Sequence, residues 1–378
     1  MISPKAFHSA LVSQGVDFFV GVPDSLLKEF CAYVDAALPS DKHLIAANEG
    51  SAVALAAGHY LATGNIAVTY LQNSGLGNTI NPLLSLADRE VYAIPMIVLI
   101  GWRGAPGVSD EPQHVKQGRV TPDLLDAMEI PYRVLDGDAA GAEAAAMWAA
   151  DAARTLQGPV ALLVHKGAFG KSEEKRGEAA ARPDLPSRED AIAMITGRLP
   201  SSATVVATTG MISRELYEQR VANGQDRSSD FLTVGSMGHA SQIALGIATA
   251  RPTANVVCID GDGSVLMHMG GMATIGTTKT GNLLHIVLNN GAHDSVGGQP
   301  TVAFDISLTA IARACGYDAV EGPVEKANDI TQQIDRLSQL PGRRFLEVRV
   351  AKGSRADLGR PKETPVENKA VFIARLRG

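Results

Sequence analysis

The sequence predicts an α/β protein with two parallel sheets, each doubly wound with helices on both faces. Short apolar runs alternate with stretches of helical periodicity along the whole chain, which is typical of parallel strands buried on both faces. The chain has 378 residues, and about two domains are expected at roughly one to two hundred residues per domain. The predicted strands also fall into two sets of equal number, separated by one polar stretch.

Each predicted strand is a short apolar run bounded by turn residues. Helical patterns alternate with these runs, which favours parallel pairing in both sheets. In the first half the strands are expected at residues 18–20, 44–47, 66–71, 96–100, 132–135 and 160–164. In the second half they are expected at residues 204–207, 231–234, 255–259, 283–288, 318–320 and 345–350.

The polar stretch at residues 171–190, KSEEKRGEAAARPDLPSRED, is expected to be a solvated linker. It is dense in charge, contains prolines and lacks an apolar period. It separates a first domain at residues 1–170 from a second domain at residues 191–378. Another loop-like stretch, residues 351–369, precedes a final helical pattern, and its composition leaves open whether it is a lid or a tether.

The composition disfavours nucleic-acid-binding, disulfide-rich and membrane proteins. A formal charge of −6, from 34 basic and 40 acidic residues, argues against a nucleic-acid binder that relies on a general positive field. Cys31, Cys258 and Cys315 are too few and too scattered for a disulfide framework or a cysteine-based zinc site, which favours a reducing compartment. No uncharged apolar run approaches the length of a membrane span. We therefore expect a soluble cytoplasmic protein.

One segment of the second half carries the clearest chemical signal. Asp262 follows the predicted strand 255–259 inside Gly-Asp-Gly-Ser (261–264), and the next helix begins with small residues whose backbone N–H groups can approach a phosphate. Asn289 and Asn290 end the following strand. Because parallel strands bring their carboxyl ends to one edge, a carboxylate and an amide oxygen converge there, which predicts a magnesium diphosphate site. Taken singly, each motif is also a common turn, with Asp262 as a helix N-cap.

The order and spacing of these motifs resemble the thiamine diphosphate-dependent decarboxylases. That family carries GDG followed after somewhat under thirty residues by NN, which here are residues 261–263 and 289–290. The resemblance implies thiamine diphosphate and Mg²⁺ as cofactors. It also implies that Asp262 and Asn289 bind Mg²⁺ through their side chains, with the carbonyl of Gly291 as a third protein ligand. The residues expected against the diphosphate are Gly261, Gly263 and Ser264.

Two further motifs match the same family. Glu49, in LIAANEGSAVALAAG, resembles the glutamate that pairs with the aminopyrimidine ring of the cofactor and promotes loss of the proton from C2. Its alternative role is as a favourable partner of the helix dipole, with Asn48 as the cap. The run Gly235-Ser236-Met237-Gly238 resembles the family's turn in which the apolar residue wedges under the cofactor. The alternative for Met237 is a place in the core.

Within the family, the likeness is closest to the short enzymes that decarboxylate phosphonopyruvate, and it runs over most of the chain. Larger members carry a central third domain, whereas this chain joins a pyrimidine-binding (PYR) half, residues 1–170, to a diphosphate-binding (PP) half, residues 191–378, by the linker alone. The resemblance implies conversion of 3-phosphonopyruvate to phosphonoacetaldehyde and CO₂ in phosphonate biosynthesis. It also implies a homo-oligomer with the cofactor between the pyrimidine half of one subunit and the diphosphate half of another.

Several residues are candidates for contact with the substrate. Asp24 and Ser25 resemble the family's polar residues above the thiazolium ring, and His114 is a candidate proton donor. Arg103 follows the strand 96–100 and offers a fork suited to a phosphonate, although a solvated surface charge is the alternative. Further candidates are His293, Asp294 and Ser295 after the metal motif, and the basic residues Lys116, Arg119, Lys352, Arg355 and Arg360.

The sequence bears on several other functions. A nicotinamide-dependent dehydrogenase would carry a glycine-rich turn after the first strand, where this chain has GVPDSL. A noncatalytic subunit of the same fold would lack either Glu49 or the metal residues. Sulfopyruvate decarboxylase is the nearest rival, because sulfonate and phosphonate differ by a proton and a charge in a pocket of one shape. Carboligation of the acetohydroxyacid synthase type is a further alternative.

Overall fold

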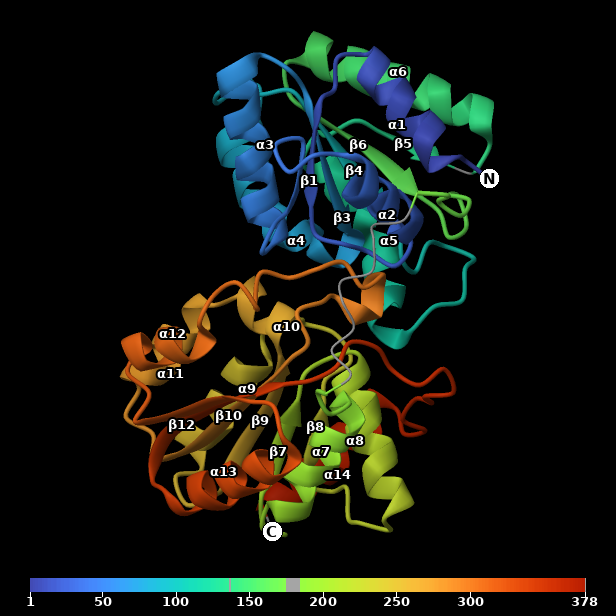
Figure 1. The fold of residues 1–378 in the computed structure, drawn as a ribbon. Coiled ribbons are helices and arrows are strands. Elements are labelled where there is room, and N and C mark those ends of the chain that lie inside the picture. The colour runs from blue at the N-terminus through green and yellow to red at the C-terminus, as the bar shows by residue number, and fades with distance from the viewer. Residues whose placement is uncertain (136, 175–183, 378) are drawn as a thin grey trace. The chain divides into compact units, whose positions relative to one another are not determined.

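The computed structural model describes residues 1–135, 137–174 and 184–377. The chain forms two compact units, Met1–Glu178 and Ala179–Gly378, and each contains one six-stranded parallel sheet with helices on both faces (Figure 1). The predicted fold class is confirmed. The division between the units falls inside the stretch expected to be a linker, of which residues 175–183 lie outside the described part of the chain.

Unit 1 is a doubly wound sheet in the order β2-β1-β3-β4-β6-β5, with every neighbouring pair parallel. All residues of the central strand β4 are buried, because helices cover both faces of the sheet. Its strands are β1 (Phe18–Gly21), β2 (His43–Ile45), β3 (Ala67–Gln72), β4 (Met96–Gly101), β5 (Tyr132–Leu135) and β6 (Pro159–Val164). Its helices are α1 (Pro4–Ser13), α2 (Lys28–Ala37), α3 (Glu49–Thr63), α4 (Leu76–Pro82), α5 (Pro112–Ala127) and α6 (Ala139–Leu156).

Unit 2 repeats this topology without an obvious repeat in sequence. Its order β8-β7-β9-β10-β12-β11 is the order of unit 1 when the strands of each unit are counted from its own first strand. Its strands are β7 (Thr204–Ala207), β8 (Asp230–Leu232), β9 (Val256–Gly261), β10 (Asn282–Asn289), β11 (Ala319–Val324) and β12 (Gly342–Arg349). Its helices are α7 (Arg188–Arg198), α8 (Met211–Ala222), α9 (Ala240–Ala250), α10 (Asp262–Met267), α11 (Gly270–Thr277), α12 (Leu308–Cys315), α13 (Ala327–Gln339) and α14 (Pro365–Arg377).

Each sheet separates two apolar cores. In unit 1, buried residues of α1, α2 and α6 pack on one face and those of α3, α4 and α5 on the other. In unit 2, one face carries α7, α8 and α13, and the other carries α9, α10, α11 and α12. This arrangement leaves the carboxyl edge of each sheet to loops, which is where open α/β sheets bind ligands.

Several predicted strands differ from the structure at their ends. The edge strands predicted at residues 44–47 and 231–234 end earlier, at His43–Ile45 and Asp230–Leu232, because a flanking apolar run does not imply continued pairing. The strands predicted at residues 318–320 and 345–350 are longer in the structure, at Ala319–Val324 and Gly342–Arg349. Among the described residues, no helix is long and apolar enough to cross a membrane.

One polar group is buried within unit 2. The side chains of Cys258, Asp260 and His285 approach within 4.8 Å of one another. His285 Nε2 lies 3.5 Å from the Asp260 carboxylate, and its Nδ1 lies 3.1 Å from the Tyr317 hydroxyl. Burial raises the pKa of the Cys258 thiol, which keeps it protonated. His285 thus bonds Tyr317 through Nδ1, whereas its Nε2 has no hydrogen-bond partner among the described residues.

Candidate functional site

The metal motif of unit 2 lies on two adjacent parallel strands. Leu288 on β10 pairs with Gly261 on β9, so the register brings the next residues, Asn289 and Asp262, to the same edge of the sheet. Asp262 is the first residue of α10, and β10 ends at Asn289. The convergence of these two chain segments, expected from strand order alone, is present in the structure.

Asp262 is a buried carboxylate at the start of α10. Its side chain is only 3% exposed, and the Thr301 hydroxyl donates a hydrogen bond to Oδ2 at 2.5 Å. Among the described residues, no ion pair reaches it. Burial raises the pKa of Asp262 to about 6, although Thr301 and the backbone N–H groups of Asn290 and Gly263 act in the opposite direction. A divalent cation would neutralise this carboxylate.

The two asparagines have different partners. The Asn289 amide nitrogen donates to Glu347 at 2.9 Å and to the Ala303 carbonyl at 3.2 Å, and its oxygen accepts the N–H of Gly291. The Gly291 carbonyl accepts the N–H of Thr301. Asn290 instead directs its backbone N–H toward the Asp262 carboxylate. The expected ligands Asn289 and Gly291 therefore have partners within the protein, and so does the Asn290 side chain, which bonds Asp294 and the Ala292 N–H. Asn290 joins them as a candidate because its backbone N–H faces the Asp262 carboxylate.

The two glycine-containing motifs of unit 2 are in direct contact. Ser264 accepts the N–H of Gly238 at 3.0 Å and lies 3.0 Å from the Thr208 hydroxyl. Gly238 has a φ of 86°, and a Cβ there would lie 2.4 Å from the His268 ring, so only glycine suits this position. Ser236 also has a positive φ, 53°. Gly235, which begins this turn, lies three residues after Leu232, the buried last residue of β8.

The expected cofactor-facing residues surround Gly263. A Cβ on Gly263 would lie 3.1 Å from the His293 ring and 3.4 Å from the Met237 methyl group. Met237 is only half-buried, so it is not a core methionine. Burial lowers the pKa of His293 to about 4, which keeps the imidazole neutral at pH 7. Because Gly263 has no side chain, there is space between the His293 imidazole and the Met237 thioether.

Other expected substrate residues of unit 2 have partners within the protein. Asp294 accepts hydrogen bonds from Arg188, Asn290 and the Gly353 N–H, and its expected role as a substrate contact stays a prediction. Ser295 is exposed and lies beside Gly210.

The basic residues of the C-terminal loop are not aligned toward a common ligand. Arg355 forms ion pairs with Glu189, Glu218 and Asp357, and Lys352 donates to the Gly298 carbonyl. The charge of Arg355 is therefore balanced at the surface of unit 2, which is the solvated role that such a loop usually has. Arg360 is exposed in the same loop.

In unit 1, Glu49 is the first residue of α3 and Asn48 caps that helix by accepting the Ser51 N–H at 2.9 Å. The Glu49 side chain is 5% exposed, and Asn78 donates to its carboxylate at 2.7 Å. A Cβ on Gly75 would lie 2.1 Å from Glu49 Oε1, so this glycine provides the room that the carboxylate needs. Burial raises the pKa of Glu49. A carboxylate kept away from water in this way is suited to proton transfer near neutral pH.

This burial predicts a pH-dependent effect of Glu49→Gln on the cofactor-free protein. Because the folded-state pKa is raised above the ordinary 4.5, the ionised carboxylate destabilises the fold above the folded pKa and has no such effect below 4.5. We expect the variant to melt about 3 °C above wild type at pH 8, with the difference vanishing as the pH falls through that window. Calorimetry at several pH values measures it, and a difference that grows on acidification would contradict it.

The other polar residues of unit 1 gather at the carboxyl edge of β1, β3 and β4. Asp24 is fully buried and accepts hydrogen bonds from Gln72 at 2.6 Å and from the Leu26 N–H at 2.9 Å, and burial raises its pKa. A Cβ on Gly101, the last residue of β4, would lie 2.0 Å from the Asp24 carboxylate. This carboxylate is therefore held by the fold rather than exposed to solvent.

Arg103 is not the unpaired fork that the sequence suggested. Its Nε donates to Asp110 at 2.7 Å, its second terminal nitrogen also pairs with Asp110, and NH1 donates to Ser25 at 3.0 Å. The Arg103 guanidinium lowers the pKa of Asp110. Arg103 is therefore neutralised within the protein, and it positions Ser25 at the sheet edge.

His114 lies in the first turn of α5 and is buried. Burial, and then the charge of Arg103, lower the pKa of His114, so the ring is neutral at pH 7. Lys116 and Arg119 on the same helix are exposed, as the alternative of solvated charges expects.

Sequence reasoning missed the groups that hold these side chains. Asn78 donates a hydrogen bond to Glu49, and Gly75 leaves space for the Glu49 carboxylate. Thr301 donates to Asp262, and Asp110 pairs with Arg103. The order of the strands does not predict any of these contacts. The signal that could have found Thr301 was its place in the GGQPT run after the metal motif.

Comparison with known families matches both halves of the chain. Residues 4–130 match the N-terminal TPP-binding domain of thiamine pyrophosphate enzymes, and residues 209–348 match their C-terminal TPP-binding domain. The first match contains Glu49 and the second contains the turns at Gly235 and Asp262.

Curated relatives align over nearly the whole chain. Phosphonopyruvate decarboxylase of Streptomyces viridochromogenes is 39% identical over 393 positions, covering 99% of this chain and 95% of the relative. The enzyme of the same name from Streptomyces hygroscopicus is 38% identical, covering 97% and 92%. Sulfopyruvate decarboxylase of Methanosarcina acetivorans is 32% identical, covering 84% and 83%. The chain therefore belongs to the thiamine diphosphate-dependent 2-oxo acid decarboxylases, which are carboxy-lyases.

Proposed function

We propose that the protein catalyses the Mg²⁺-dependent decarboxylation of 3-phosphonopyruvate to phosphonoacetaldehyde and CO₂, as a step in phosphonate biosynthesis. The likeness along the chain carries this proposal: two phosphonopyruvate decarboxylases match 99% and 97% of it at 39% and 38% identity. The sulfopyruvate enzyme matches 84% at 32% identity. The polar groups at both sheet edges support a cofactor-dependent reaction of this kind.

The residues of unit 2 fit Mg²⁺ and a diphosphate. Asp262 is a buried carboxylate without an ion-pair partner among the described residues, and hard oxygen ligands suit this ion. We assign its other protein ligands to oxygen atoms of residues 289–291. The diphosphate would lie against Gly261, Gly263 and Ser264, where the missing side chain at Gly263 leaves room beside His293 and Met237.

The residues of unit 1 fit the proton transfers of the reaction. Thiamine diphosphate supplies the electron sink for the electrons that remain when CO₂ leaves. Glu49 would hold and move a proton at the pyrimidine ring, since burial makes its carboxylate a stronger base than an exposed one. Its hydrogen bond from Asn78 keeps the carboxylate in one orientation.

At the substrate end, we assign Ser25, Asp24 and His114 to the reacting 2-oxo acid. Asp24 and Ser25 lie in the loop that follows β1, and His114 lies in the first turn of α5, the helix that follows β4. A neutral His114 retains a ring N–H and is able to donate it. Because Arg103 is paired with Asp110, it would act on a phosphonate only through the electric field of that pair. The remaining candidates, His293 and Ser295, follow the metal motif in unit 2.

We also propose a cytoplasmic homo-oligomer with active sites between subunits. Glu49 and Asp262 belong to different compact units, and each unit matches a different TPP-binding domain. In this proposal, the two domain types that hold one cofactor belong to different subunits.

The substrate assignment is tested by turnover with a panel of 2-oxo acids. With thiamine diphosphate and Mg²⁺ present, we expect kcat/KM for phosphonopyruvate to exceed that for sulfopyruvate by at least about tenfold and that for pyruvate by at least about a hundredfold. Aldehyde formation from each acid is the readout. Comparable rates on pyruvate would exclude the phosphonate assignment.

Sulfopyruvate decarboxylase is the second candidate. The full-length relative in Methanosarcina acetivorans and the separate alpha and beta subunits in Methanothermobacter thermautotrophicus all match parts of this chain. Faster turnover of sulfopyruvate than of phosphonopyruvate in the same panel would establish that activity instead.

A further inference from the structure

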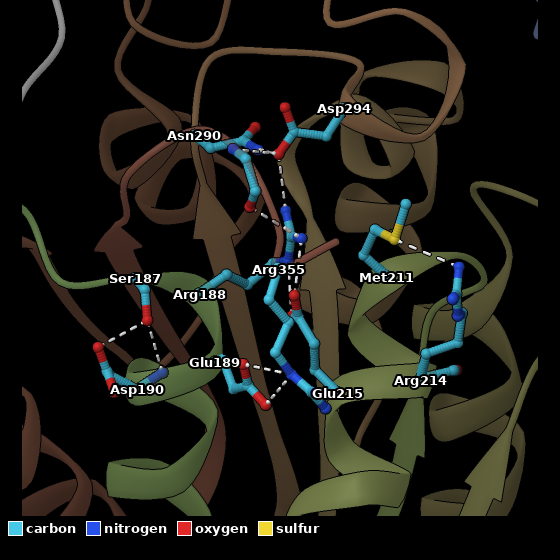
Figure 2. A network of polar contacts seen from close by, with 12 residues as sticks. Ser187, Arg188, Glu189, Asp190, Met211, Arg214, Glu215, Asn290, Asp294 and Arg355 are labelled. Atoms are coloured by element: carbon cyan, nitrogen blue, oxygen red, sulfur yellow. Dashed lines mark hydrogen bonds and ion pairs between the residues drawn. The ribbon is translucent and has the colours of Figure 1, made fainter. Parts of the chain in front are cut away.

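A buried arginine joins four segments of unit 2. Arg188, at the first position of α7, is only 4% exposed, and it contacts the Glu215 carboxylate through Nε and NH2, both at 2.8 Å. Its remaining nitrogen, NH1, donates to Asp294 at 2.9 Å. NH2 also reaches the Gly353 carbonyl at 3.3 Å. Figure 2 shows this side chain between Glu215 and Asp294.

Asp294 gathers three donors on a single oxygen. Its Oδ2 accepts from Arg188, from the Asn290 amide nitrogen at 2.7 Å and from the Gly353 N–H at 2.9 Å. The Asn290 amide oxygen accepts the Ala292 N–H at 3.0 Å. Because an ionised carboxylate only accepts, its bond to Asn290 fixes which end of that amide faces Asp294 and which end faces away.

We propose that Arg188 and Asp294 are positioning residues for the cation at Asp262, acting through the side chain of Asn290. Asn290 follows Asn289 at the end of β10, and the pairing of Leu288 with Gly261 brings it to the same sheet edge as Asp262, so the orientation of Asn290 bears on the cation site. Arg188 holds Asp294, and Asp294 holds the Asn290 amide, as outer groups hold the ligands of many metal sites. This inference rests on the proposed Mg²⁺-dependent function.

The charges show why the arginine is suited to this task. The planar guanidinium donates to Glu215 through two nitrogens and to Asp294 through the third. The single ammonium group of lysine cannot form this set of hydrogen bonds. Loss of Asp294 leaves the buried Arg188–Glu215 pair balanced, whereas loss of Arg188 leaves two buried carboxylates. Variants of Asp294 therefore perturb the turn with the least risk to the fold.

The test compares Asp294→Ala and Asp294→Asn by cofactor binding, with thiamine diphosphate and increasing Mg²⁺ as the probes. The readout is the Mg²⁺ concentration that gives half of the melting-temperature increase caused by thiamine diphosphate. We expect Asp294→Ala to raise it at least about tenfold, and Asp294→Asn to stay within about threefold of wild type, because its amide oxygen still accepts. The matched control is Asp230→Ala, which removes another buried carboxylate paired with an arginine, Arg220, in the same unit.

A purely structural role would lower the melting temperature of both alanine variants but leave the Mg²⁺ requirement unchanged. Wild-type Mg²⁺ dependence in Asp294→Ala, or an equal rise in Asp230→Ala, overturns the positioning role while leaving the proposed function intact. If Asp294→Ala does not fold, Arg188→Lys replaces it in the test. The same rise in the Mg²⁺ requirement is then expected, and an unchanged Mg²⁺ requirement would overturn the positioning role. Failure of the proposed function has a separate signature, because wild type itself would then bind thiamine diphosphate without Mg²⁺ or not at all.

Discussion

Replacing Glu49 with glutamine is expected to lower kcat for decarboxylation by at least about a thousandfold, while thiamine diphosphate affinity changes by less than about threefold. Glutamine keeps the shape of the side chain and can still accept the hydrogen bond from Asn78. It cannot hold or release a proton at a carboxylate oxygen. Steady-state turnover and thermal stabilisation by the cofactor separate the two effects.

A matched control is available within the same unit. Glu29 also lies in the first turn of a helix, α2, where it accepts the Ser172 N–H, and Glu29→Gln is expected to retain turnover near that of wild type. Retained activity in Glu49→Gln would contradict the proton-transfer role. A joint loss of activity and cofactor binding would indicate a binding role instead.

Replacing Asp262 with alanine is expected to weaken Mg²⁺-dependent binding of thiamine diphosphate by at least about a hundredfold, because it removes the one charged ligand of the proposed set. The variant also removes a buried carboxylate that has no ion-pair partner among the described residues, so we expect its cofactor-free form to be no less stable than wild type at pH 8. Titration with Mg²⁺ at fixed thiamine diphosphate measures the binding. Equal protection of both proteins by the two cofactors would refute the metal assignment.

Nearby substitutions sharpen this test. Asp305→Asn changes an exposed aspartate in the loop that also carries Thr301, and it is expected to leave the Mg²⁺ requirement unchanged. Asn290→Ala is expected to raise that requirement, whereas Asn289→Ala is expected to act mainly on stability, because its buried amide bonds Glu347 and Ala303. If Asn289→Ala raises the Mg²⁺ requirement and Asn290→Ala does not, Asn289 is the Mg²⁺ ligand.

The strand pattern was enough to predict the sheets because apolar runs between helical patterns can be buried in few ways. The central strands agree closely with the apolar runs, and Asp262 and Asn289 meet because they end neighbouring parallel strands. The ends of the edge strands β2 and β8 were predicted too far along the chain, since one-sided pairing leaves them to local contacts, and β11 and β12 are longer than their apolar runs. The family likeness was likewise visible in short motifs.

The partners of the site residues depended on tertiary structure. Asp110 neutralises Arg103, Asp294 turns toward Arg188, and Gly75 provides room for Glu49. These contacts join segments that the linear pattern leaves unrelated, and each is set by packing at the sheet edge rather than by periodicity. The amino-acid order thus specified which residue types reach each edge, while the folded chain determined which charges are balanced there and which remain for a ligand, because burial and pairing are properties of three-dimensional neighbours.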